Sequence, residues 1–527
     1  QRTESLCGLF YLLTLYAFAR GTICHPMDDK PAGPVARRWL GAAVAACLIG
    51  MGTKEVMVTA PLLVLLYDRT FAAGTFSAAV RSRGKFYGAL AATWVVLAWL
   101  VIKSGGARGA SAGFGLGVTG WTYLLKQAEA LVQYLWLSLW PHPLVFDYGT
   151  DVVVSVGAVA GQGIGVLALL AATIWALRQR PALGFLGAWF FLMLAPSSSV
   201  VPLVTQTMAE HRMYMPLAAV VGFASLAVYQ LCGSRAPWLM MAAAFVLGGV
   251  SITRNRDYRD AVTLWADTVA KRPQNARAHN NLALALQQQG DLARAHAHFA
   301  QAVELDAGYV TARYNWGVAL LGEQRFAEAI TQLAAAVARA PDHVDARINL
   351  GNALVRAGRA RDALPHFEHA LRLQPGADVH FNLGVALADL GENDAAVRHL
   401  QSALQFDARW PEAHYQLARL AERGGRTAEA ESLYRATLQH APRHAAAHGK
   451  LGLLLARAER LASAAEHFRA VIALQPDDAD AHANLGNVLL LQGQAREAIA
   501  LYETVLRLRP NDARTRENLQ IAREALR

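Results

Sequence analysis

The sequence predicts an all-α protein in two parts, a polytopic transmembrane helical domain followed by an α-solenoid of helical repeats. Composition supports the first part, because 54% of the 527 residues are hydrophobic, 17% are charged and the mean hydropathy is +0.21. The apolar blocks end near residue 252. Periodicity supports the second part, because a helical pattern recurs every 33 or 34 residues from about residue 276 onward.

Charge and cysteine usage argue against two other classes of protein. The net charge of +10 arises from Lys and Arg scattered among loops and repeats, with no basic run interleaved with aromatic residues. We therefore expect no nucleic-acid partner. The four cysteines show no paired spacing, which predicts neither a disulfide framework nor a zinc site. We expect no cofactor and no bound metal.

Apolar segments in the first half are candidates for membrane helices, which need about 20 residues to cross a bilayer. They are residues 3–19, 39–53, 55–67, 86–102, 121–140, 157–177, 183–195, 212–231 and 237–252. The second and third meet at Gly52-Thr53-Lys54-Glu55, where we expect a tight hairpin rather than one broken helix.

Lys and Arg in short loops predict the orientation, because such loops stay in the cytoplasm. Four loops are basic, residues 20–38, 68–85, 178–182 and 232–236. They share one side if the amphipathic segment 121–140 lies at the interface and eight segments cross. This topology predicts an integral protein of a bacterial inner membrane, in contact with the lipid bilayer. Its repeats then lie on the periplasmic, non-cytoplasmic side.

Polar residues beside membrane segments are candidates for function. Two clusters qualify, Lys54-Glu55 and Glu210-His211-Arg212. Their cations suit a lipid-linked phosphate, since Arg forks onto phosphate oxygens and Lys supplies a point charge. The alternative is that Lys54 pairs with Glu55 or another neighbour, and Glu210 with Arg212, as interfacial anchors. Residues 141–149 predict an interfacial turn, with His142 and Asp147 as site residues a weaker alternative.

A Leu or Trp followed by Gly or Ala marks each repeat. The marks begin at Leu282, Trp316, Leu350, Leu383, Leu417, Leu451 and Leu485. An Ala lies thirteen residues after each mark, and an aromatic residue or Leu follows four residues later. This is the tetratricopeptide pattern, in which each unit is a helix–turn–helix that is stable only when stacked on its neighbours.

The repeat pattern also sets the domain limits. We assign residues 1–252 to the transmembrane domain, 258–275 to a half-repeat junction, 276–512 to seven repeats and 513–527 to a capping helix. One histidine recurs at an equivalent position in five repeats (His279, His380, His414, His448 and His482). Metal ligation needs convergence within a few ångströms, so packing or groove lining is the better account.

The residue before each mark is usually Asn, on the face of the first helix that tends toward the concave groove. The candidates for an acceptor-peptide groove are Asn281, Asn315, Asn349, Asn382 and Asn484. An Asn amide both donates and accepts hydrogen bonds, so a ladder of them can hold an extended peptide backbone. It resembles the ladder in the superhelix of O-linked N-acetylglucosamine transferase. The alternative is that Asn is simply common at this position of such repeats.

Three segments carry a wider resemblance: GMGTKEVMVTAPLLVLLYDRTF, LWPHPLVFDYG and LAPSSSVVPLVTQTMAEHRMYMPLAAV. With the repeats, they resemble a bacterial family similar to the transmembrane and tetratricopeptide-repeat O-mannosyltransferases of the GT-C glycosyltransferase class. The resemblance implies transfer of a sugar from a polyprenyl-phosphate donor to an acceptor protein presented by the repeats. It places five residues beside the lipid phosphate: Lys54, Glu55, Glu210, His211 and Arg212.

The same resemblance leaves the catalytic residue unassigned. It implies an acidic residue in an outer loop upstream of Gln1, so we expect the chain to be an amino-terminally truncated part of such an enzyme. The alternative function is a non-catalytic, membrane-anchored scaffold that binds partner proteins through its repeats.

Overall fold

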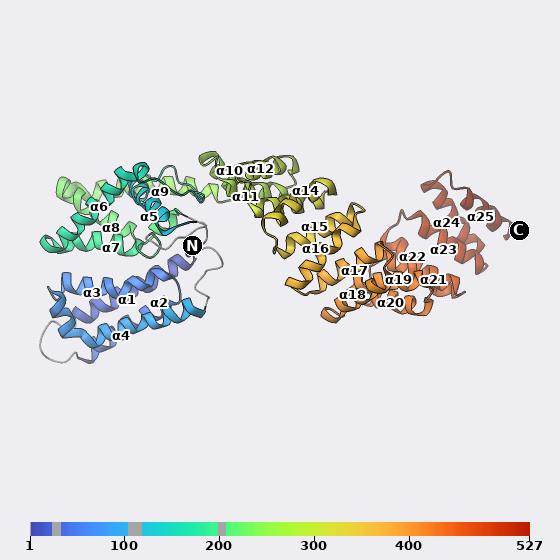
Figure 1. Ribbon diagram of the computed structural model, residues 1–527, viewed down its shortest axis with the longest axis horizontal. Helices are drawn as coiled ribbons and strands as arrows, with labels where there is room; N and C mark the ends of the chain where they lie inside the picture. Colours follow the sequence, from blue (N-terminus) through green and yellow to red (C-terminus); the bar gives the residue numbers. More distant parts are fainter. Residues whose placement is uncertain (1, 24–32, 104–117, 199–206, 527) are drawn as a thin grey trace. The chain divides into compact units, whose positions relative to one another are not determined.

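The computed structural model describes residues 2–23, 33–103, 118–198 and 207–526, and every regular element in these ranges is a helix (Figure 1). The predicted all-α class is therefore confirmed. The chain divides into two compact units, Gln1–Ala307 and Gly308–Arg527. The predicted domain limits at residues 252, 276 and 512 rest on composition and repeat register rather than on compactness. They stay a prediction.

The apolar half consists of nine α-helices and three short 3-10 helices within the described residues. The α-helices are α1 (Arg2–Ile23), α2 (Pro34–Met51), α3 (Ala60–Phe71), α4 (Phe76–Lys103), α5 (Gly120–Leu139), α6 (Val156–Gln179), α7 (Pro181–Leu194), α8 (Leu217–Cys232) and α9 (Ala236–Asp257). The 3-10 helices are η1 (Glu55–Thr59), η2 (Glu210–Met213) and η3 (Gly233–Arg235). The expected turn between α2 and η1 lies at Gly52–Lys54.

Helices α1 to α8 share one apolar core. Helix α1 packs on α2, and α4 packs on both α2 and α3. A second set joins α5 to α6, α6 to α7 and α7 to α8, and contacts between α3 and α7 connect the two sets. Large buried rings, among them Tyr11, Phe18 and Tyr134, fill the centre of this core.

Four helical stretches in the described part of the chain are long and apolar enough to cross a membrane, judged by length and composition. They are Thr3–Ile23, Pro34–Met51, Val156–Gln179 and Leu217–Asp257, the last comprising α8, η3 and α9. The predicted segments in α3 and α7 form helices of only 12 and 14 residues. Because a crossing takes about 20 helical residues, neither helix is long enough by itself to cross a bilayer.

The second half begins with α10 (Ala261–Lys271) and continues as seven antiparallel helix pairs. The pairs are α11 (Ala276–Gln288) with α12 (Leu292–Leu305), α13 (Val310–Gly322) with α14 (Phe326–Arg339), α15 (Val344–Arg356) with α16 (Ala360–Leu373), α17 (Ala377–Asp389) with α18 (Asn393–Phe406), α19 (Pro411–Arg423) with α20 (Thr427–His440), α21 (Ala445–Arg457) with α22 (Leu461–Leu474) and α23 (Ala479–Leu491) with α24 (Ala495–Leu508). Helix α25 (Ala513–Glu524) packs on α24.

A small residue on the first helix of each pair leaves room for a large side chain from the second helix. A Cβ atom built on Gly351 would lie 2.5 Å from the ring of Phe367, which is 0% exposed. The same arrangement recurs between Gly384 and Leu400 and between Gly486 and Tyr502. Because such distances are far inside van der Waals contact, the glycine is what permits the two helices to approach.

Replacing Gly351 by Leu should destabilise the array by about 1–3 kcal/mol, since the new side chain overpacks the space that Phe367 fills. Gly322→Leu is the matched control, because Gly322 is exposed and no heavy atom lies within 4 Å of a Cβ built there. Urea unfolding followed by circular dichroism measures both. Equal midpoints for the two variants would contradict the packing argument.

Candidate functional site

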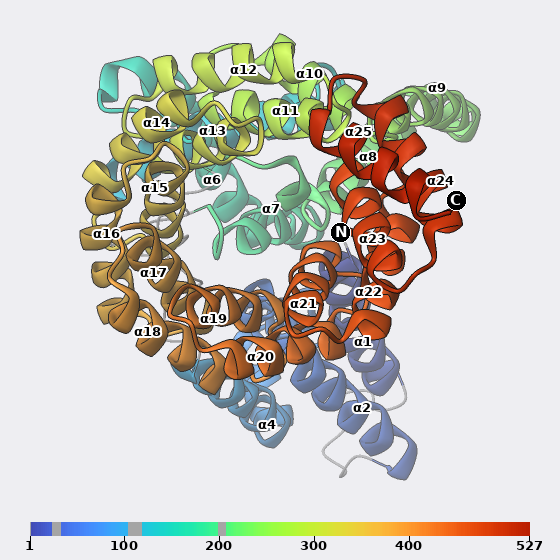
Figure 2. The same ribbon diagram turned by 90° about the vertical axis from the view of Figure 1, so that its right-hand side faces the viewer.

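The first helices of the repeats line the inner side of the curved second unit. Figure 2 shows α15, α17, α19 and α21 facing the inside of the curve, with α16, α18 and α20 outside. Exposed residues on the inner helices therefore face a shared concave surface, which we call the groove. Concave faces of this kind are the binding surfaces that helical-repeat solenoids use.

The predicted Asn residues of this unit lie on these inner helices. Asn315, Asn349, Asn382 and Asn484 are each half-buried, so their amides stay within reach of a ligand. The Nδ2 of Asn349 donates to the carbonyl of Asp345 at 2.9 Å, which orients Oδ1 as the acceptor. Asn281 lies on α11 in the first unit, where its Oδ1 accepts from Asn280 at 3.0 Å.

A row of stacked rings, which the sequence analysis missed, lies beside the Asn residues. In the second, fourth and fifth repeats, the residue before the Asn or its Gln counterpart packs its ring against the ring of a residue 29 positions later, at the start of the next inner helix. The pairs are Tyr314 with His343, Phe381 with Trp410 and Tyr415 with His444, with ring centroids 5.1, 4.6 and 4.7 Å apart. A recurring aromatic 29 residues before another is the sequence signal that identifies them.

The recurring histidines pack between the two helices of a repeat. Three of them meet a second histidine, with Nδ1–Nδ1 distances of 3.0 Å (His279–His298), 3.1 Å (His380–His399) and 2.9 Å (His448–His467). The Nε2 of His448 lies 3.0 Å from the carbonyl of Pro442, which assigns it the proton. Its Nδ1 then accepts, so His467 donates from Nδ1.

A polar cluster in the first unit brings together two of the predicted phosphate-binding residues. Lys54 forms an ion pair with Glu4 at the start of α1, and the Nε2 of His211 lies 3.9 Å from the same carboxylate. Burial and the neighbouring Lys54 lower the pKa of His211. Glu4 was not predicted, because nothing in the sequence pairs residue 4 with residues 54 and 211.

Glu210 and Arg212 serve different parts of the fold. Oε1 of Glu210 accepts from the backbone N–H of Val145 at 2.6 Å and from the Tyr148 hydroxyl at 2.7 Å. Burial raises the pKa of Glu210 and of Tyr148. Arg212 is 8% exposed and donates to the Tyr123 hydroxyl and to two backbone carbonyls, those of Ser197 and Thr207. The anticipated Glu210–Arg212 pair is replaced by these contacts.

The predicted interfacial turn, residues 141–149, is the joint between the apolar helices and the first repeat. Asp147 is 5% exposed, and its two carboxylate oxygens accept from Arg277 on α11 at 2.5 Å each. Asn275 donates to the Asp147 carbonyl at 3.0 Å, and Lys271 donates to the Leu144 carbonyl at 2.9 Å. Asp147 thus has structural partners, which favours the interpretation as a turn.

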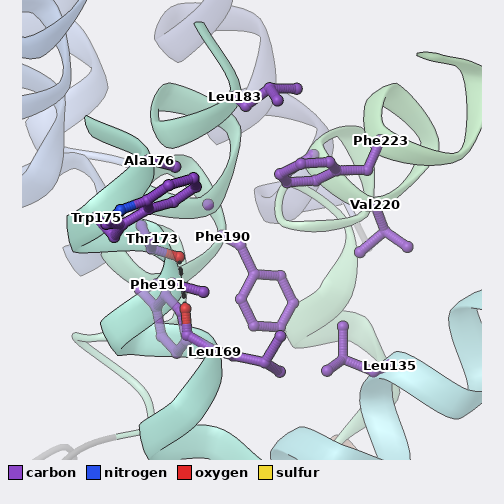
Figure 3. A pocket seen from close by; sticks show the side chains of 13 residues that line it. Leu135, Leu169, Thr173, Trp175, Ala176, Leu183, Phe190, Phe191, Val220 and Phe223 are labelled. Atoms are coloured by element: carbon purple, nitrogen blue, oxygen red, sulfur yellow. Dashed lines mark hydrogen bonds between the residues drawn. The ribbon is translucent and has the colours of Figure 1, made fainter. Parts of the chain in front are cut away.

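Two apolar cavities lie among the helices of the first unit. One of about 590 Å³ is lined by residues of α1 from Ser5 onward, by Trp189 and by the segment Tyr214–Val221, which begins three residues after His211. The other, of about 410 Å³, lies among α5, α6, α7 and α8 (Figure 3). Its lining includes Phe190, Phe191 and Phe223, and the Thr173 hydroxyl is already bonded to the Leu169 carbonyl at 2.8 Å. Both cavities suit hydrocarbon rather than polar ligands.

Comparison with known proteins gives matches in the second half of the chain. Tetratricopeptide-repeat family models match residues 254–310, 309–376, 348–414, 415–475 and 450–513. Residues 254–513 are a tetratricopeptide-repeat array. No curated protein matches the chain.

Solved structures that resemble the chain include other repeat proteins. PilF of Pseudomonas aeruginosa is 17% identical, with 41% of this chain and 96% of that chain covered and a TM-score of 0.36. A tetratricopeptide-repeat protein of Parabacteroides merdae is 16% identical, with coverages of 47% and 98% and a TM-score of 0.37. MamA of Desulfovibrio magneticus is 23% identical, with coverages of 33% and 98% and a TM-score of 0.30.

The tetratricopeptide-repeat array should lose stability in mild acid. Burial, followed by the neighbouring His448, lowers the pKa of His467, so protons bind more readily to the unfolded chain. Stability is therefore complete above the unfolded pKa of about 6.5 and falls as the pH drops below it. His467→Leu should reduce this loss, because repeats five and seven carry Leu433 and Leu501 at this position. The loss of stability is measured by amide hydrogen exchange of α21 and α22 at pH 7 and pH 5, in wild type and in His467→Leu.

Proposed function

We propose that this protein is a membrane-anchored scaffold whose tetratricopeptide-repeat groove binds an extended segment of a partner protein. The observation that carries the proposal is the recurrence of half-buried Asn side chains at one position of the inner helices α13, α15 and α17 and again of α23. Repeat arrays of this type support protein–protein interaction, and the groove supplies both polar and aromatic contacts for it. The partner and its sequence are for experiment to identify.

The Asn amides suit backbone recognition. An extended peptide presents alternating N–H and C=O groups, and an amide side chain can accept from the first and donate to the second. Asn349 illustrates the acceptor role, because its Nδ2 is held by Asp345 while Oδ1 stays available. Contacts of this kind are made to the peptide backbone, so they contribute affinity whatever the peptide's side chains are. Specificity must therefore come from other residues of the groove.

The exposure of apolar side chains on two helical stretches supports the membrane anchor. Helix α6 has one buried residue, Val159, and α9 has one, Ala236, among their described positions. Trp175 is 59% exposed, Trp238 72% and Phe245 76%. Apolar surface of this extent is stable in hydrocarbon and a liability in water. The periplasmic side for the repeats remains part of this proposal. Eight crossings would require α3 and α7 to cross together with residues outside their 12 and 14 helical positions.

Combined replacement of Asn349 and Asn382 by Ala should weaken peptide binding by about 5- to 150-fold, since each lost hydrogen-bonding amide costs about 0.5–1.5 kcal/mol. Gln401→Ala is the control, because Gln401 is exposed on the outer helix α18. Fluorescence anisotropy with peptides selected from a random library by the purified full chain measures the affinity. Unchanged affinity in the double variant would contradict backbone recognition by the Asn residues.

A second candidate function is sugar transfer from a polyprenyl-phosphate donor, as the glycosyltransferase resemblance implies. The observation that favours it is the position of Lys54 and His211 around Glu4, together with an apolar cavity of about 590 Å³ that is lined by Ser5, the next residue after Glu4. A lipid phosphate would compete with Glu4 for Lys54, and the cavity would take the start of the lipid chain. The contacts of Glu210 and Arg212 favour structural roles for these two residues.

Lys54→Met should lower the binding of a polyprenyl phosphate by about tenfold or more, because it removes a charge-assisted contact worth about 1.5–3 kcal/mol. Lys85→Met, at an exposed position of α4, is the charge-matched control. Native mass spectrometry of the protein in detergent with added polyprenyl phosphate gives the bound fraction. Equal binding by both variants would rule out Lys54 as a phosphate ligand and leave the scaffold as the function.

A further inference from the structure

The last pair of the row joins Tyr415 of the fifth repeat to His444 at the start of the sixth. The position filled by Tyr314, Phe381 and Tyr415 in earlier repeats is Gly449 in α21, and the stacking partner 29 residues later is Asp478. Where a ring would lie, a cavity of about 230 Å³ opens on the groove. Three other repeats also lack a ring at this position, where they carry Asn280, Ile348 and Ala483. Among the seven repeats, Gly449 alone leaves the position without any side chain.

We propose that this cavity is a specificity pocket that takes one aromatic side chain of a peptide bound in the groove. The inference rests on the proposed scaffold function and adds to it the class of residue recognised. Pockets for drug-sized ligands measure about 300–1,000 Å³, so this smaller cavity suits a single side chain. The incoming ring would occupy the place that the Gly449 position leaves open.

The floor and wall of the pocket are apolar. Phe468 is 1% exposed and Val471 is 4% exposed, and both come from the outer helix α22 beneath the groove. Leu453 extends this floor, and the ring of Tyr415 forms a side wall. Burial of an aromatic side chain against such a surface is favourable, and ring–ring contact adds about 0.5–1.5 kcal/mol beyond the burial itself.

The rim is polar, but its charges already have partners. Oδ1 of Asp478 accepts from the backbone N–H groups of Asp480 and Ala481 at 2.9 and 3.0 Å. The Asp480 carboxylate pairs with Arg509 at 2.6 Å, and Lys450 lies 3.8 Å from Glu422. A charged ligand side chain would have to compete with these existing partners for its counter-charge. A neutral aromatic side chain needs no counter-charge, so it can bind without breaking them. A Tyr hydroxyl or Trp N–H can still reach the rim.

The position of Asn484 links the pocket to the proposed backbone contacts. Asn484 belongs to the Asn series and also lines this cavity. A peptide whose backbone bonds to Asn484 would therefore present a neighbouring side chain to the pocket. This geometry predicts that selected peptides share one aromatic residue at a fixed place.

Gly449→Phe tests the pocket by filling it from within, and Gly449→Ala is its control. A Cβ on Gly449 meets its nearest neighbour, Val471 Cγ2, at 3.9 Å, so Ala fits without displacement. We expect Gly449→Phe to weaken binding of library-selected peptides at least tenfold, while Gly449→Ala stays near wild type. Circular dichroism checks that both variants fold. Replacing the shared aromatic of the peptide by Ala should weaken wild type but not weaken Gly449→Phe further.

Three outcomes would overturn the pocket. The pocket is refuted if Gly449→Phe and Gly449→Ala bind with equal affinity, or if the selected peptides share no aromatic residue. If the Asn349/Asn382 double variant still loses binding in either case, the proposed scaffold function stands and only the pocket falls. Failure to select any peptide with the full chain would instead refute the proposed scaffold function, and the pocket with it.

Discussion

The close approach of the two helices within each repeat is the constraint on which the second half of this protein depends. Gly351 and its equivalents leave space for a large buried side chain, so the two helices of each pair pack tightly. Each packed pair then stacks on the pair of the next repeat. Stacking then fixes which side of every first helix faces the groove. The Asn residues, the stacked rings and the opening at Gly449 are positioned by this packing, because all lie on those first helices.

The sequence predicted the repeats well because their signal is periodic and local. Seven marks at spacings of 33 or 34 residues determine the helix pairs and the inner face, and they place Asn349 and Asn382 on that face. The stacked rings were missed although their spacing of 29 residues is also regular. The histidine pairs were missed for another reason. Their partners lie on the opposite helix, 19 residues away, and the second histidine is absent from several repeats.

The apolar half was harder to predict because its contacts join distant residues. The turn before Lys54 and the presence of the helices followed from composition, but the pairing of Lys54 with Glu4 spans 50 residues without a repeating pattern. Likewise Glu210 was expected beside Arg212 and instead holds Val145 and Tyr148, more than 60 residues away. Asp147 joins Arg277 across 130 residues. These contacts couple the turn at 141–149 to the first repeat within the first unit.

The central claim is that the inner face of the array binds an extended peptide. Site-specific photocrosslinking tests it most directly, with a photoreactive residue placed at Asn382 on α17 or at Gln401 on α18, and a library-selected peptide as the target. We predict that the peptide crosslinks to position 382 and that an excess of unlabelled peptide abolishes this product. Crosslinking at position 401 and not at 382 would contradict the account.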